Sequence, residues 1–186
     1  MSRQFDSAEW ILNCTGLVRV RYASEKNPIF ADEEKLAAED FRQRFDSIEA
    51  GCHKTVDPDA HYQSLSTIGL HFSGPFKSLV GVKRGHFKSR CELKIPDTKA
   101  IMPKSFEFPH VIHPSTLDCI IQMGLAAATP AEEELKVGLI PTSIAHLYIS
   151  KKVPSSAGEL LHGVAAIENE GFEHAQGSFI VFDNTW

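Results

Sequence analysis

The stretch HPSTLDCIIQMGLAA, residues 113–127, sets one carboxylate among side chains that are almost all apolar or small. Proline fits the first turn of a helix, so Pro114 predicts a helix start, and the next breaker is the pair Thr129-Pro130. On a helix the apolar residues gather into one stripe, made of Leu117, Ile121, Gly124, Leu125 and Ala128. We therefore predict a long, mostly buried helix with Asp118 at the rim of its apolar stripe.

Asp118 raises the question of why a carboxylate stands in such a helix. Gln122 follows one helical turn later, where its amide can hydrogen-bond the carboxyl group and fix its rotamer. One interpretation is structural, a satisfied polar pair near a helix start. The other is chemical, because burial raises a carboxyl pKa by roughly 3–5 units, whereas the field of a helix N-terminus is worth roughly 0.3–1 kcal/mol. A carboxyl group kept protonated in a dry pocket is a general acid.

The segments around this helix predict antiparallel strands. In HFKSRCELKI, residues 86–95, alternate side chains from Phe87 to Ile95 share one face, and the charged side chains share the other. Further strands are expected at 139–150, 160–168 and 173–182, together with an alternating strand at 10–22. One apolar helix among several antiparallel strands is an α+β arrangement.

Changes in composition divide the chain into three parts. Residues 1–22 end with the alternating strand, and residues 23–56 are polar and charged, which predicts a linker with an exposed helix at 32–45. Asp57 and Pro58 predict the start of a short helix that stops near Gly69. Residues 57–186 would then form the main module.

The composition is typical of a globular protein. Of the 186 residues, 42% are hydrophobic and 23% are charged, and the formal net charge of −5 supplies no basic surface for nucleic acid or an anionic membrane. No apolar run approaches the roughly 20 residues of a bilayer span. Four widely spaced cysteines, with no CxxC pair and no secretory leader, predict reduced thiols and a cytoplasmic location.

Two motifs resemble those of a known family. HPSTLDCIIQ, residues 113–122, is similar to the HPxxLDxxxQ helix in the C-terminal half of the dehydratase domain of polyketide synthases, and GLHFSGPF, residues 69–76, resembles the Gly-Leu-x-Tyr-Gly-Pro-x-Phe stretch before it. LIPTSIAHLYIS and WILNCTGLVRV resemble segments of the highly reducing fungal enzymes. The resemblance implies a double hotdog fold, in which each module is a long helix wrapped by an antiparallel sheet. Residues 1–22 would end the first hotdog, and residues 57–186 would be the second.

The resemblance also implies a reaction. In that family a 3-hydroxyacyl chain, carried on the phosphopantetheine of an acyl carrier protein, loses water to give the trans-2-enoyl thioester. Asp118 would protonate or hold the leaving hydroxyl, and Gln122 would orient Asp118. The acyl chain would be bound by Phe72, Pro75, Phe76 and Leu117. No other cofactor is implied, and the expected partners are the carrier protein, the N-terminal hotdog and other domains of the megasynthase, and a second copy in a homodimer.

The sequence departs from the family's pattern at two points. The family's base is a histidine in a His-x-x-x-Gly-x-x-x-x-Pro motif, and none of the nine histidines here has that context. We therefore expect the base to lie on a missing N-terminal hotdog and the isolated chain to be inactive. In the second motif Phe72 stands where the family has tyrosine, and the glycine and proline are shifted by one position to Gly74 and Pro75.

Other functions stay open at this stage. A product-template domain shares the fold and the aspartate but cyclises a poly-β-keto chain, and Gln122 with LIPTSIAHLYIS favours the dehydratase over it. A non-catalytic module that binds acyl chains or organises the megasynthase would explain the absent base. A single-hotdog thioesterase that acts as a dimer would place its carboxylate similarly.

Histidines and a cysteine near the predicted helix are candidate metal ligands or nucleophiles. His110 and His113 form an HxxH pair, but no third ligand follows at a supporting spacing, so no metal site is expected. His113 is interpreted instead as a helix-start residue. Cys119, beside Asp118, is interpreted as an inert core thiol because no cationic partner is evident.

Overall fold

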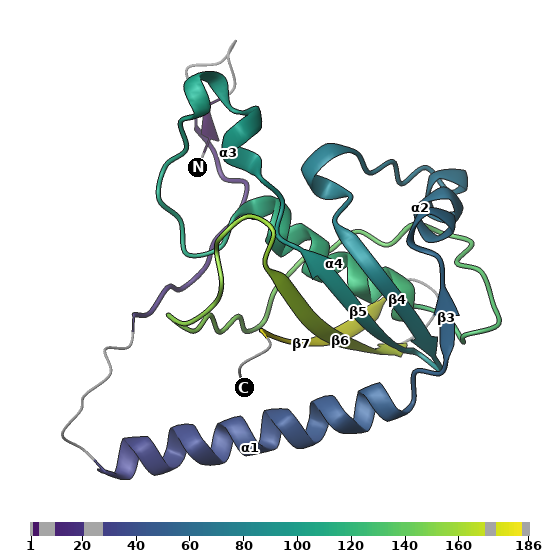
Figure 1. The fold of residues 1–186 in the computed structure, drawn as a ribbon, viewed down its shortest axis with the longest axis horizontal. Coiled ribbons are helices and arrows are strands. Elements are labelled where there is room, and N and C mark those ends of the chain that lie inside the picture. Colours follow the sequence, from purple (N-terminus) through teal and green to yellow (C-terminus); the bar gives the residue numbers. More distant parts are fainter. Residues whose placement is uncertain (1, 4–9, 21–27, 170–173, 184–186) are drawn as a thin grey trace. The chain divides into compact units, whose positions relative to one another are not determined.

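The structure is a computed structural model that describes residues 2–3, 10–20, 28–169 and 174–183, and its contacts divide the chain into two units, residues 1–37 and 38–186 (Figure 1). In the first unit β1 (Ser2–Arg3) pairs antiparallel with β2 (Trp10–Ile11). Residues 12–20 form neither helix nor strand, and their side chains are exposed. The strand predicted at 10–22 is therefore wrong beyond Ile11, and its last two residues lie outside the described residues. Alternating apolar and polar side chains stabilise a strand only where a neighbouring strand pairs with it and a core buries its apolar face. Here β1 pairs with β2 over only two residues.

The second unit is built on an antiparallel sheet with the strand order β3-β4-β5-β6-β7. The strands are β3 (Lys54–Val56), β4 (Leu79–Gly85), β5 (Lys88–Lys94), β6 (Leu160–Asn169) and β7 (Ala175–Phe182). In β5 alternate residues are buried, and its register with β6 runs from Lys88↔Ala166 to Lys94↔Leu160. The strands predicted in HFKSRCELKI and at 160–168 are confirmed, and so is that at 173–182 from Ala175 on, its first residue lying outside the described residues. Strands β3 and β4 were not predicted.

The helices are α1 (Pro28–Ala50), α2 (Pro58–Thr67), α3 (Thr98–Ile101) and α4 (Pro114–Ala127), with short 3₁₀ turns η1 (Gly74–Phe76) and η2 (Pro103–Ser105). Helices α2 and α4 follow the predicted start and stop signals, whereas α1 is longer than the predicted 32–45 and α3 was not predicted. The carboxylate of Asp57 accepts a bond from the backbone N–H of Ala60 at 2.9 Å and caps α2. Gly69, just beyond α2, has a φ of 86°, which glycine adopts without strain.

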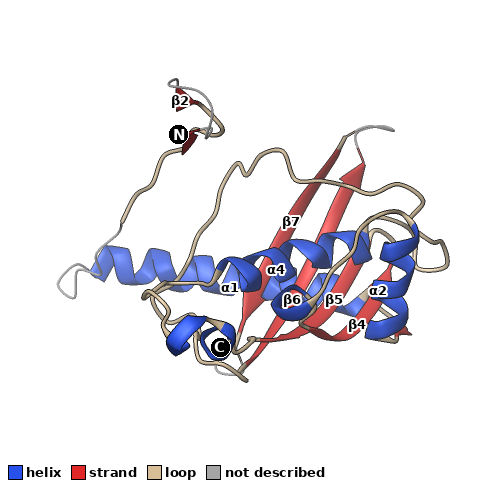
Figure 2. Ribbon diagram, turned by 90° about the horizontal axis from the view of Figure 1, so that it is seen from above, coloured by secondary structure: helices blue, strands red, loops and turns tan. Residues whose placement is uncertain are grey.

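Helix α4 packs against one face of the sheet, and Figure 2 shows it running across the strands. The apolar side chains that α4 buries are small or flexible, namely Cys119, Met123, Ala126 and Ala127. A Cβ at Gly163 on β6 would lie 2.5 Å from Cε of Met123, so glycine at this position allows the helix to approach the sheet closely. Of the predicted stripe, Gly124 and Ala128 are buried. Leu117, Ile121 and Leu125 are only half-buried, because close approach selects the small residues for the sheet-facing side.

The second half of α1 covers the opposite face of the sheet. Phe45 and Ile48 are buried with Val164 of β6, and the Phe45 ring lies 4.4 Å from that of Phe182. Arg90 of β5 forms a salt bridge with Glu49 at 3.0 Å. Residues 38–56 therefore belong to the sheet unit, whereas the sequence had placed them in a linker.

The strand predicted at 139–150 is wrong. The segment forms neither helix nor strand, and apolar side chains along it are exposed, including Ile140, Ile144, Leu147 and Tyr148. Pro141 has no backbone N–H to give to a ladder, which favours this outcome. In the part of the chain that the structure describes, no helix has both the length and the apolar composition to span a bilayer.

The buried side chain of Arg84 closes the C-terminal end of α4. Its Nε donates to the Ala126 carbonyl at 3.0 Å, and its Nη2 donates to the carbonyls of Glu133 at 2.7 Å and Pro130 at 3.2 Å, and to the Thr129 hydroxyl. The last carbonyls of a helix have no partner within it and carry partial negative charge. Arg84 therefore gives a donor to one of the last carbonyls of α4 and places a positive charge at this helix end.

Replacing Arg84 tests this role. We expect Arg84→Met to lower the free energy of unfolding by about 2–4 kcal/mol, because it leaves the buried Ala126 carbonyl without a side-chain donor and removes the bonds to the partly buried carbonyls of Pro130 and Glu133. Urea denaturation of the variant, compared with Lys83→Met at the exposed neighbouring position, measures the loss. A midpoint for Arg84→Met that equals that of the Lys83 control would contradict the assignment.

His61 on α2 gives the fold a pH dependence. Burial, reinforced by the positive charge of Arg84, lowers the pKa of His61 to about 4, and Glu134 opposes this shift. Because the pKa is about 6.5 in the unfolded chain, the unfolded state binds the proton first as pH falls, so stability is complete above pH 6.5 and is lost from there down to about pH 4. We expect unfolding by urea to cost about 2 kcal/mol less at pH 5 than at pH 7.

The His61→Gln variant should lose most of that pH dependence, while a variant of the exposed His86 should keep it. Parallel slopes of stability against pH in the wild type and His61→Gln would rule His61 out as the cause.

Candidate functional site

Asp118 and Gln122 form the pair that the helical spacing predicts. The Gln122 Nε2 donates to Oδ2 of Asp118 at 2.7 Å and to the backbone carbonyl of Phe76 at 2.9 Å. Gln122 is 2% exposed, whereas Asp118 is half-buried at the rim of α4. The dry environment expected for Asp118 is therefore not found, and its carboxyl group remains accessible to a ligand.

A residue that the sequence analysis missed completes this group. The phenol Oη of Tyr62, on α2, donates to Gln122 Oε1 at 3.0 Å and accepts the backbone N–H of Leu79 at 3.2 Å. Tyr62 is 6% exposed, and burial raises the pKa of its phenol well above the ordinary value. A buried tyrosine requires a partner for its hydroxyl, and that requirement was the available signal. The partner itself lies 60 residues away in the sequence.

The residues predicted to bind the acyl chain lie around this pair to different extents. The Pro75 carbonyl lies 3.8 Å from Sγ of Cys119, so the η1 turn sits against α4 beside Asp118. The Phe76 side chain is 42% exposed, while its carbonyl accepts from Gln122. Phe72 is half-buried, with its ring centroid 5.9 Å from that of Tyr62. Leu117, directly before Asp118 on α4, is also half-buried.

The histidines near the start of α4 gather on one carboxylate. Glu107 Oε1 lies 3.0 Å from His113 Nε2 and 3.9 Å from His110 Nδ1, and it accepts the Thr98 hydroxyl at 2.9 Å. The Nδ1 of His113 accepts the backbone N–H of Ser115 at 3.1 Å and caps the helix, which confirms His113 as a helix-start residue. Among the described residues, no three His, Cys, Asp or Glu side chains are arranged to hold a metal ion.

Two potential nucleophiles near this site are inaccessible. The Ser115 hydroxyl lies 2.7 Å from His113 Nδ1, and with Glu107 this gives the order serine, histidine, carboxylate that hydrolases use. Ser115 is 0% exposed, however, so no substrate can reach its oxygen. Cys119 is also 0% exposed, and burial raises the pKa of its thiol, which makes it a poor nucleophile, as predicted.

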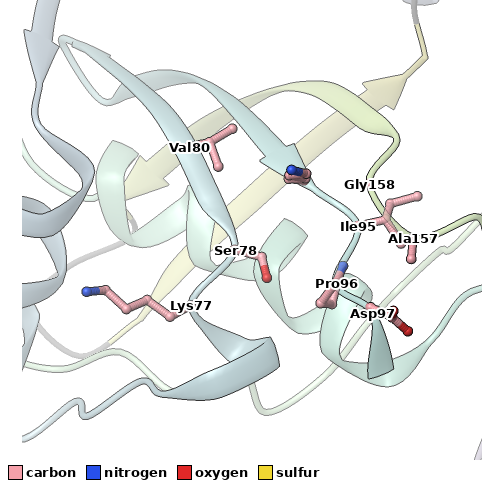
Figure 3. Close-up of a pocket in the computed structure, with 9 residues that line it drawn as sticks. Lys77, Ser78, Val80, Ile95, Pro96, Asp97, Ala157 and Gly158 are labelled. Atoms are coloured by element: carbon pink, nitrogen blue, oxygen red, sulfur yellow. The ribbon is translucent and has the colours of Figure 1, made fainter. Parts of the chain in front are cut away.

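An open depression of about 490 Å³ lies elsewhere on the surface of this unit (Figure 3). It is lined by Lys77, Ser78, Val80, Lys94, Ile95, Pro96, Asp97, Ala157 and Gly158, and neither Asp118 nor Gln122 belongs to its lining. Figure 3 shows the Lys77 side chain pointing away from Pro96 and Asp97, and its Nζ lies 2.6 Å from Asp59. We therefore place the candidate site at Asp118, on the basis of its hydrogen bonds rather than of this hollow.

Comparison with known sequences finds similarity to one enzyme family. Residues 41–185 match the family described as "Polyketide synthase dehydratase N-terminal domain". The reducing polyketide synthase FUB1 of Gibberella moniliformis is 31% identical over 98% of this chain, and the highly reducing polyketide synthase tstA of Talaromyces stipitatus is 31% identical over 94%. This chain spans 8% of the first protein's length and 7% of the second's.

A solved structure shows the same fold. The dehydratase domain from the CurJ module of the curacin polyketide synthase superposes with a TM-score of 0.54 at 23% identity, covering 75% of this chain and 47% of that domain. The α+β hotdog fold predicted from the sequence is thereby confirmed. The matched family's description refers to an N-terminal domain, so the predicted placement in the C-terminal half stays a prediction.

Proposed function

The chain belongs to the polyketide synthase dehydratase family, and on this premise we propose that it is the C-terminal, acid-bearing hotdog of a dehydratase. The observation that carries the proposal is the bond from Gln122 Nε2 to Asp118 Oδ2, on a helix whose HPSTLDCIIQ sequence resembles that half of the family's domain. The substrate would be a 3-hydroxyacyl chain on the phosphopantetheine of an acyl carrier protein. The products would be the trans-2-enoyl thioester and water.

Asp118 would act as the general acid. It would give a proton to the 3-hydroxyl as the C3–O bond breaks, while a base removes a proton from C2 and the C2–C3 double bond forms. Gln122 would hold the carboxyl group in place, because its own amide is fixed by Phe76 and Tyr62. None of the nine histidines lies in the family's base motif, so the base would come from a histidine on the N-terminal hotdog.

The neighbouring residues would guide the acyl chain. Pro75 and Phe76 on η1 lie beside Asp118, and Leu117 and Phe72 would extend this wall. The carrier protein, other megasynthase domains and a second copy in a homodimer would complete a cytoplasmic assembly.

Substrate choice separates this proposal from its closest rival. A product-template domain would take a poly-β-keto chain and cyclise it, whereas a dehydratase requires the 3-hydroxyl that Asp118 protonates. The amide of Gln122 on Asp118 favours the dehydratase. Turnover of a 3-hydroxyacyl thioester, with no reaction of a poly-β-keto analogue, is the expected result for the complete enzyme, and the reverse pattern would identify a cyclase.

The isolated chain should not dehydrate a 3-hydroxyacyl thioester at an appreciable rate. The acid and the base contribute as one unit, so either alone is nearly ineffective. Mass spectrometry of the thioester after incubation with the chain, and with the chain plus the histidine-bearing module of the same synthase, makes the measurement. Turnover by the chain alone that equals the two-module reaction would show that the base lies within these residues.

Replacing Asp118 tests its role in the two-module enzyme. We expect Asp118→Asn to lower kcat by about 10²–10⁴, because the N–H protons of an amide are not acidic enough to be transferred to the departing hydroxyl. The free energy of unfolding should change little, since the asparagine is nearly isosteric and its oxygen still accepts from Gln122. Asp59→Asn, at an exposed position on α2, is the matched control and should leave kcat unchanged. Normal dehydration by the Asp118 variant would make the residue purely structural.

A further inference from the structure

We propose that Tyr62 is a positioning residue that determines which way round the Gln122 amide lies, and thereby which oxygen of Asp118 carries the transferable proton. The hydrogen bonds around Gln122 carry the first half of this proposal. The second half, which concerns the proton, rests on the proposed function.

The hydrogen-bond inventory leaves one orientation for the Gln122 amide. A phenol has one donor, and the Tyr62 oxygen already accepts the N–H of Leu79, so its hydroxyl proton is available to Gln122 Oε1. The other end of the amide faces the Phe76 carbonyl and the Asp118 carboxyl oxygen, both of which are acceptors. The two ends of a glutamine amide are almost equal in size, so these partners decide the orientation rather than the shape of the site.

The orientation has a consequence for Asp118. Its Oδ2 receives an N–H from Gln122 at 2.7 Å, and in a protonated carboxyl group the carbonyl oxygen accepts a hydrogen bond better than the hydroxyl oxygen does. A protonated Asp118 therefore carries its proton on Oδ1, the oxygen that Gln122 leaves free. If the amide turned round, its carbonyl would repel an ionised Asp118 and would accept a proton from Oδ2, directing that proton away from a substrate.

Tyr62 is itself firmly held. Its side chain is buried in the main core, its ring packs edge-on against Phe72 at 5.9 Å, and its oxygen is bonded to the start of β4. The family has a tyrosine where this chain has Phe72, and here the neighbouring phenol comes from α2. Tyr62 bonds Gln122, and Gln122 in turn bonds Asp118. Tyr62 therefore acts through the Gln122 amide and not on the substrate.

Hydrogen exchange in the intact wild-type chain provides the first test. Both side-chain amide protons of Gln122 should exchange at least about tenfold more slowly than those of Gln63, an exposed neighbour on α2, since a buried hydrogen bond is worth about that factor. Nitrogen-resolved NMR of the two side chains measures the rates. Equal rates for Gln122 and Gln63 would overturn the proposal without any variant.

The Tyr62→Phe variant tests whether the phenol is the cause. We expect the Gln122 amide protons to exchange about tenfold faster, because the amide loses the hydrogen bond that holds its carbonyl end. Ser89→Ala is the matched control, since Ser89 also gives a buried hydroxyl to α4, at the Met123 carbonyl and 2.7 Å, without touching Gln122. Equal acceleration by both variants would mean that Tyr62 is merely structural.

Kinetics of the two-module enzyme test the catalytic consequence. Tyr62→Phe should lower kcat about tenfold and leave KM nearly unchanged, and the double variant Tyr62→Phe/Gln122→Leu should be no slower than Gln122→Leu alone. Additive losses would show that Tyr62 acts by another route. If the wild-type enzyme does not dehydrate a 3-hydroxyacyl thioester, the proposed function fails, and the exchange rates still test whether Tyr62 holds the Gln122 amide.

Discussion

The close contact between α4 and the sheet is the constraint on which the rest of the second unit depends. The helix presents cysteine, alanine and a single methionine to strands that carry Gly163 at the point of closest approach. With larger side chains on either surface the two layers would separate, because packed interiors leave no room for added atoms. At this spacing, the Tyr62 hydroxyl and the Phe76 carbonyl both lie within hydrogen-bonding distance of the Gln122 side chain.

The sequence predicted those parts of the structure that depend on short separations along the chain. The start of α4 at Pro114, the alternation in β5 and the bond between Asp118 and Gln122 follow from spacings of four residues or fewer. The strand predictions at 12–20 and 139–150 are wrong because a strand depends on pairing with a distant segment. The alternation of apolar and polar residues does not show whether such a partner strand exists. The contact of Tyr62 with Gln122 spans 60 residues, so no local pattern could identify it.

The candidate site combines a buried, firmly held residue with a more accessible one. Gln122 is almost fully buried and has hydrogen bonds on both ends of its amide, whereas Asp118 is half-buried. Placing the fixed group inside and the reacting group at the edge keeps the carboxyl geometry constant without closing it to a ligand. The buried thiol and serine nearby show that proximity to this rim does not by itself give access to it.

Helix α4 is fastened at both ends, by His113 with Glu107 at its start and by Arg84 at its last turn. A helix free to slide by one residue would advance by about 1.5 Å and rotate by about 100°, which would carry Asp118 off the rim altogether. The two fastenings come from separate parts of the chain, the loop that contains Glu107 and the strand β4. The position of α4 along its axis and its rotation are thus set by groups that do not contact the Asp118 carboxylate. Sequence changes far from Asp118 would therefore change how deeply its carboxyl group lies relative to a bound substrate.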